Sequence, residues 1–143
     1  MTLYTSDIDI NRKRAAKTAF VYLLVSLFCV LFGAVYEIYS HEVYSYYMLY
    51  AFCFPLVGGT TVFSILGLLN LKKYPNGIAR NLYHSGIATL TVGSIIRGVL
   101  DIYGTTNLLS NYYWKVGFSL AIAGVFVCLM NLFVCRVEAD NEL

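Results

Sequence analysis

Charged residues are scarce in this chain and are missing from long stretches of it. Asp, Glu, Lys and Arg make up 13% of the 143 residues, well below the roughly 25% that is usual in soluble domains. None of the four types occurs in residues 18–36, 43–71, 81–96 or 116–135. Because 59% of the residues are hydrophobic as well, this scarcity excludes an ordinary soluble domain and favours an integral membrane protein.

Motifs for catalysis and for metal binding are missing too. The four cysteines form no Cys-x-x-Cys pair, which argues against a zinc site and against a dithiol oxidoreductase. The chain has no His-Glu-x-x-His, no glycine-rich phosphate loop and no Ser-His-Asp constellation at a plausible depth. We therefore expect no enzymatic activity, no metal and no cofactor.

What the chain does have is four apolar segments of membrane-spanning length. Since about 20 predominantly apolar residues cross the hydrocarbon core as a helix, the pattern predicts transmembrane helices near residues 17–39, 46–71, 80–103 and 113–135. The fold class is therefore all-α, a single membrane domain over residues 1–143 with tails at 1–16 and 136–143. Short connections favour an up-down-up-down four-helix bundle. We expect the first segment to remain in the mature protein as a signal anchor.

The positions of lysine and arginine predict the orientation. If the chain crosses four times, eight of its ten basic residues lie on one side, and Lys115 stands alone in the flanks of the other. Both termini are therefore expected in the cytoplasm, with the protein in the cytoplasmic (plasma) membrane. The basic cluster at residues 11–17 is explained as a topology determinant that meets anionic lipid, and not as a nucleic-acid site. The opposite side is rich in tyrosine, which suits either an anchoring belt or an aromatic binding surface.

One charged pair falls inside a predicted span, in the stretch SIIRGVLDIYG. Arg97 and Asp101 are four residues apart and share a helix face, and Glu37 is expected at a similar depth on the first helix. Two interpretations stay open. The three residues form either a structural ion cluster that fixes helix register or an outward-facing polar site for a ligand.

Glycines predict where the helices approach one another and where one of them bends. Small residues on one helix face let backbones come close in lipid. The expected packing residues are Gly86, Gly93 and Gly104 on the third helix and Gly117, Gly124 and Asn131 on the fourth. Pro55, followed by Gly58 and Gly59, predicts a kink in the second helix, either as ordinary packing or as the broken helix of a transport site.

A weak internal similarity links the two halves of the chain. Residues 37–39 and 101–103 both show an acid followed by Ile-Tyr, and residues 68–71 and 129–132 both show Leu-x-Asn-Leu. This pattern suggests a tandem repeat of helical hairpins, although short apolar motifs also match by chance.

Two functions are compatible with these features. The favoured one is a non-enzymatic accessory or interaction protein that packs against itself as a homo-oligomer or against a larger membrane-protein partner. The alternative is a minimal, oligomeric transporter or ligand-binding membrane protein that uses Arg97, Asp101 and Glu37 beside the Pro55 kink. A polar cavity lined by these residues would favour transport, and mutual bonding among them would favour a structural role.

Overall fold

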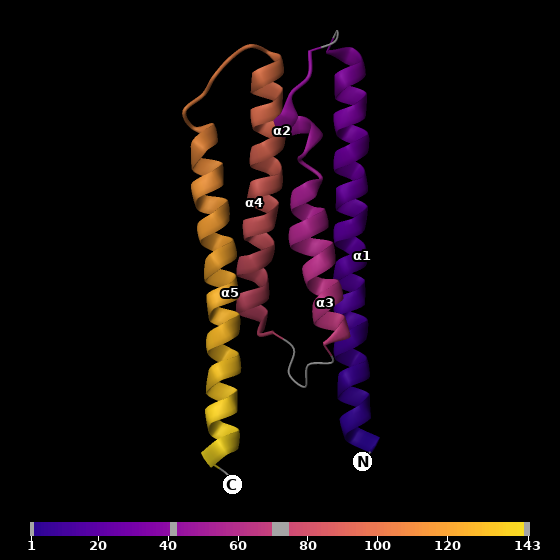
Figure 1. Cartoon of the computed structure of the whole chain (residues 1–143), viewed down its shortest axis with the longest axis vertical. Helices are drawn as coiled ribbons and strands as arrows, with labels where there is room; N and C mark the ends of the chain where they lie inside the picture. Colours follow the sequence, from indigo (N-terminus) through magenta and orange to yellow (C-terminus); the bar gives the residue numbers. More distant parts are fainter. Residues whose placement is uncertain (1, 41–42, 70–74, 142–143) are drawn as a thin grey trace.

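The computed structural model is built of helices, as Figure 1 shows. It describes residues 2–40, 43–69 and 75–141, and this part of the chain holds no strand. The elements are α1 (Thr2–Tyr39), α2 (Tyr46–Leu49), the π-helix η1 (Phe54–Thr61), α3 (Val62–Leu68), α4 (Gly77–Ile102) and α5 (Ser110–Asn141). The predicted all-α class is confirmed.

Four helical segments are long and apolar enough to cross a membrane, which supports the assignment to the membrane class. They are Ile8–Tyr39, Tyr46–Leu68, Gly77–Ile102 and Ser110–Asn131. The predicted tails differ from the structure, because α1 already begins at Thr2 and α5 continues to Asn141. The Lys, Arg and Ala residues beside the first span favour helix, so the first helix continues beyond the apolar part. The predicted end of the second span, residue 71, lies outside the described residues, as do Lys72 and Lys73.

The helices lie side by side in an open row and not in a closed bundle (Figure 1). Among the described helices, the main chain of α5 comes close to that of α4 alone, and α1 comes close to α2, η1 and α3 but not to α4. Successive long segments run in opposite directions, and both ends of the chain lie at one end of the row. A row is stable in lipid because acyl chains cover apolar flanks as well as leucine does.

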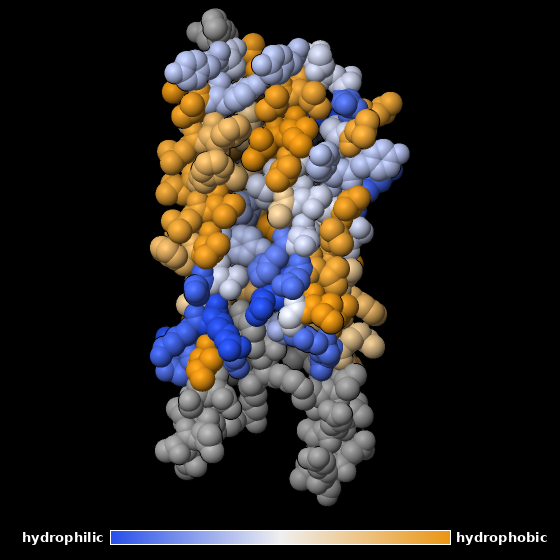
Figure 2. Space-filling model, turned by 180° about the vertical axis from the view of Figure 1, so that it is seen from behind, coloured by the Kyte–Doolittle hydropathy of each residue, from blue (hydrophilic) through white to orange (hydrophobic). Residues whose placement is uncertain are grey.

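The two outer helices carry large apolar side chains on their uncovered faces. Phe28 on α1 and Phe126 on α5 are 63% and 62% exposed. Figure 2 shows hydrophobic side chains over both flanks, with hydrophilic ones gathered toward the lower end of α1. That end carries the exposed residues Arg12, Lys13 and Arg14. The surface thus has the banded character of a protein that sits in a bilayer.

Glycines bring α4 and α5 into backbone contact. A β-carbon added at Gly86 would lie 2.5 Å from the backbone nitrogen of Ala121, and one at Gly124 would lie 2.7 Å from that of Tyr83. The other two predicted packing glycines of this pair receive side chains of the opposite helix, Gly93 that of Tyr113 and Gly117 that of Leu90. This close approach explains why α4 and α5 form the most intimate helix pair.

Two predicted packing residues do not pack between helices. Gly104 has φ +68° and no atom near its would-be β-carbon. Its N–H donates to the carbonyl of Asp101 and that of Thr105 donates to Leu100, which is the Schellman end of a helix. Asn131 is exposed, and its Nδ2 donates to the carbonyl of Val127 in its own helix, 3.0 Å away. Both residues lie beyond the stretch in which α4 and α5 meet.

The second span is broken where Pro55, Gly58 and Gly59 predict a kink. A turn separates α2 from η1, and the hydroxyl of Ser26 on α1 donates to the carbonyl of Phe52 in this turn, 3.2 Å away. A β-carbon at Gly59 would lie 2.2 Å from the ring of Tyr22, and one at Gly58 would lie 2.5 Å from Cδ1 of Ile87. The broken segment is therefore thin, and side chains from α1 and α4 enter it from two sides.

The α4–α5 interface gives the first prediction. Gly86→Ala should lower stability by about 1–3 kcal/mol, because the added methyl group meets backbone that cannot rotate away. Gly77→Ala is the matched control, since a β-carbon there meets nothing within 4 Å. Reversible unfolding in mixed detergent micelles measures both variants, and equal stability of the two would contradict the proposed packing.

Candidate functional site

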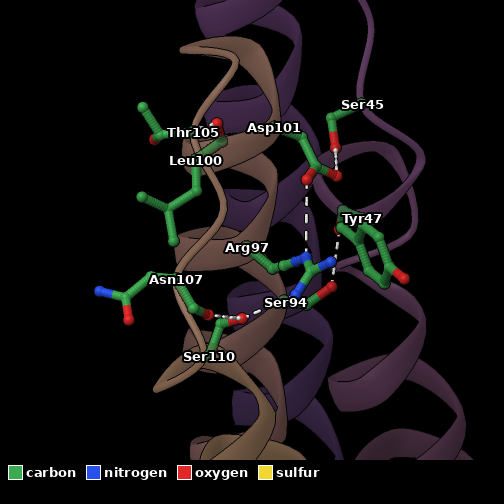
Figure 3. Close-up of polar contacts among 9 residues, drawn as sticks. All are labelled: Ser45, Tyr47, Ser94, Arg97, Leu100, Asp101, Thr105, Asn107 and Ser110. Atoms are coloured by element: carbon green, nitrogen blue, oxygen red, sulfur yellow. Dashed lines mark hydrogen bonds and ion pairs between the residues drawn. The ribbon is translucent and has the colours of Figure 1, made fainter.

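Arg97 and Asp101 form an ion pair near the end of α4 that lies far from the chain termini (Figure 3). Nε of Arg97 lies 3.5 Å from Oδ1 of Asp101, and the two side chains are 24% and 31% exposed. The helix itself positions them, because residues four apart stack on one face. Nε is buried and makes no hydrogen bond within the described chain, so the link is an ion contact alone.

Arg97 also joins α4 to its two neighbours. Its Nη1 donates to the hydroxyl of Ser110 at the start of α5, 2.8 Å away. Ser110 in turn donates to the carbonyl of Asn107, also at 2.8 Å. On the other side, the guanidinium lies 5.4 Å from the ring centre of Tyr47 on α2, within cation–π range. One side chain thus holds the beginnings of α2 and α5 against α4.

Two serines complete this arrangement. The hydroxyl of Ser45 stands at the N-cap of α2 but bonds Oδ2 of Asp101 at 3.2 Å instead of a backbone N–H of its own helix. Ser94 donates to the carbonyl of Tyr47 at 2.6 Å. We call this group the Arg97 cluster; its members are Ser45, Tyr47, Ser94, Arg97, Asp101 and Ser110 (Figure 3).

Glu37 does not join the Arg97 cluster. Its Oε1 is buried and has no hydrogen-bond partner among the described residues. The reason lies in the row, because α2 stands between α1 and α4 at this level. Buried Met48 of α2 packs against Gly33 on one side and Gly98 on the other. Of the three residues expected to form one cluster, the structure brings only Arg97 and Asp101 together.

Two grooves of the described chain lie away from these charges. A groove of 540 Å³ runs between α1 and α4 with Pro55 at its floor, and one of 370 Å³ lies beside Tyr36 and Tyr103. Neither groove has Arg97, Asp101 or Glu37 in its lining. The charged pair is accordingly bonded within the protein and does not face either space.

A second polar contact, which the sequence analysis missed, crosses the thin segment η1. The hydroxyl of Tyr22 on α1 and Nδ1 of His84 on α4 lie 2.6 Å apart. The ring of Phe63 stacks on both, with centroids 5.8 Å from Tyr22 and 5.1 Å from His84. Nearby, the hydroxyl of Tyr83 donates to the carbonyl of Gly58 at 2.6 Å. These contacts tie α1 to α4 although their main chains stay apart.

The sequence held a partial signal for the missed residues. Ser45 and Ser110 stand at helix starts, where serine is preferred, so hydroxyl groups near Arg97 were foreseeable. No such signal exists for Tyr22, because its partner lies 62 positions away. Comparisons with protein-family models, with curated proteins and with solved structures find no match.

The Arg97 cluster gives the second prediction, a double-mutant cycle. Arg97→Leu and Asp101→Leu should each lower stability by about 1.5–3 kcal/mol, because each leaves hydrogen-bonding groups of the cluster without a charged partner. The double variant should lose less than the sum, because the two residues act together.

The control is the exposed pair Lys13–Asp9, which has the same spacing, a distance of 3.6 Å and exposures of 79% and 62%. Its coupling should stay near 0.3–0.5 kcal/mol, roughly the value for exposed helical pairs. Unfolding in mixed micelles measures both cycles. Equal coupling energies in the two pairs would contradict the structural role of the Arg97–Asp101 pair.

Proposed function

We propose that this chain is a non-enzymatic, multi-pass protein of the cytoplasmic membrane that acts by packing against a larger membrane protein or against copies of itself. The observation that carries the proposal is the open row, in which α1 and α5 each keep a face of large apolar side chains uncovered. Acyl chains cover such faces as well as protein does, so the open row leaves both outer helices accessible to a partner helix but does not by itself drive the association.

The bonding of the polar groups supports this role over transport. Arg97 and Asp101 are engaged with Ser110, Tyr47 and Ser45 of the same chain. A transport site needs ionisable groups that face a cavity or pathway. The Arg97 cluster serves as a clasp that fixes how α2, α4 and α5 meet.

The proposal includes an orientation in the membrane. The chain crosses four times, up-down-up-down, with both termini in the cytoplasm. Two features support this orientation: both chain ends lie at one end of the row, and the basic residues of α1 gather at that end. A net excess of Lys and Arg marks the cytoplasmic side of membrane proteins. The tandem hairpin repeat stays a prediction; α2, η1 and α3 form a broken return, whereas α5 is continuous.

One observation favours the alternative, a ligand-binding or transporting protein. A buried carboxylate oxygen without a donor costs free energy, and Oε1 of Glu37 is such an atom within the described chain. In this alternative a cation or a donor group, from a ligand or from a second copy, lies against Glu37. The role of Glu37 would then be separate from that of Arg97.

Site-specific photocrosslinking in native membranes tests the favoured function. A benzophenone side chain in place of Phe28 or Phe126 should give crosslinks to protein, because both positions are more than half exposed. The same replacement at Phe63, which is 4% exposed, is the control and should give none between chains. If both outer positions capture lipid alone, and Glu37→Gln abolishes solute flux in vesicles, the alternative replaces the proposal.

Thiol labelling in intact cells tests the orientation. Thr106→Cys should react with a membrane-impermeant reagent added outside, because Thr106 is exposed in the connection before α5. Asn76→Cys, exposed just before α4, should react only after the membrane is opened. The reverse pattern would invert the topology, and labelling of both positions from outside would rule out a span between them.

A further inference from the structure

The groove between α1 and α4 is a consequence of the row. The two helices are held apart by η1, and Tyr22 of α1 and Ile87 of α4 reach in against its two glycines, Gly59 and Gly58. The result is a trough of 540 Å³ with Pro55 at its floor. Its volume lies within the range of about 300–1,000 Å³ that is typical of small-molecule sites.

The groove has its cationic side chain at one end and is mostly apolar along the rest. Lys17, Thr18 and His84 line the end nearer the chain termini, and Val21, Val25 and Val92 line the part beyond. From Lys17 to Val25 the wall rises by about 12 Å, at 1.5 Å per residue of helix. A cation at one end of a long apolar trough matches an amphiphile with an anionic head and a hydrocarbon tail.

The charge around the polar end has one sign. Lys17 is exposed, exposed Arg14 precedes it by one helical turn, and no acidic residue lines the groove. Clusters of this kind at the cytoplasmic surface attract anionic headgroups. The position of the charge also fits, because a phosphate belongs at the membrane surface and an acyl chain below it.

We propose that this groove binds one anionic phospholipid, with the phosphate against Lys17 and an acyl chain along the wall from Val21 to Val25. The inference stands apart from the partner role proposed above, since it concerns a trough and not the outer faces of α1 and α5.

A helix from a second copy fits the groove less well. In a copy of the same orientation, Glu37 and Asp101 lie at the far end of the molecule from Lys17 (Figure 1). Asp9 lies about two turns before Lys17 and is paired with Lys13. Of the acidic residues whose side chains the structure describes, none other than the paired Asp9 therefore lies near the depth of Lys17.

Native mass spectrometry of the full chain in a neutral detergent tests whether the groove selects a lipid with an anionic headgroup. Phosphatidylglycerol and phosphatidylcholine with identical acyl chains are added separately, and the anionic lipid should bind several-fold more tightly. Lys17→Gln should weaken phosphatidylglycerol binding about fivefold, the effect of one basic residue at a membrane surface. Lys13→Gln is the matched control and should bind like the parent, because Lys13 is 79% exposed and outside the groove lining. Equal binding of the two lipids, or equal effects of the two variants, would overturn the proposal.

Substitutions that fill the groove test whether an acyl chain lies in it. Ala88→Phe and Val92→Phe place a ring in the groove from exposed positions on α4, and both should abolish phosphatidylglycerol retention while helix content stays unchanged. Ala34→Phe, on an exposed position of α1 outside the groove, is the control and should retain the lipid.

Two further results would contradict the lipid assignment. Glycerol phosphate, which has the head but no tail, should not displace the lipid at equal concentration; displacement would mean that the groove takes a soluble anion. If Ala88→Phe and Val92→Phe keep the lipid and instead abolish a dimer seen in the same spectra, the occupant is a second copy.

Discussion

The structure depends on one constraint: hydrocarbon offers no hydrogen bonds, so every polar group within the membrane must find its partner inside the protein. The break in the second span illustrates the consequence. The carbonyl of Phe52, in the turn before η1, accepts one hydrogen bond from the backbone N–H of Leu56 and another from the hydroxyl of Ser26 on the neighbouring α1. The hydroxyls of Thr60 and Thr61 in η1 likewise donate to the carbonyls of Pro55 and Val57. Irregular backbone is tolerated here because it lies in the middle of the row, with α1 on one side and α4 on the other.

The same constraint explains which helices touch. Without a hydrophobic force between helices in lipid, association needs either a close backbone approach or a polar bridge. The α4–α5 pair has a close backbone approach at Gly86 and Gly124, and the hydrogen bond from Arg97 to Ser110 adds a polar bridge. Between α1 and α4 the Tyr22–His84 contact forms a polar bridge, and their main chains stay apart. The groove is the space left by that difference.

The sequence predicts features that depend on residues close together along one helix. It does not predict features that depend on the order of the helices in the row. Charge-free stretches predicted the four spans, and four-residue spacing predicted the Arg97–Asp101 pair. Glu37 was expected beside them because depth is readable from a sequence, but depth does not reveal that α2 stands between. The prediction that Gly104 packs between helices was wrong for a similar reason. Its position on the same helix face as Gly86 and Gly93 does not reveal where the contact between that face and α5 ends. The α1–α4 groove has no signature at all in the sequence.

The two ends of the row differ in what they offer to their surroundings. At the end away from the termini, the Arg97 cluster bonds α2, α4 and α5 to one another, so their relative register is set from within. At the other end, α1 meets α4 mainly through Tyr22 and His84, and both residues line the groove. Any molecule that fills the groove therefore touches the polar contact between α1 and α4. An occupant there would act on the outermost helix while leaving the α4–α5 pair untouched, because that pair is held by its own glycines.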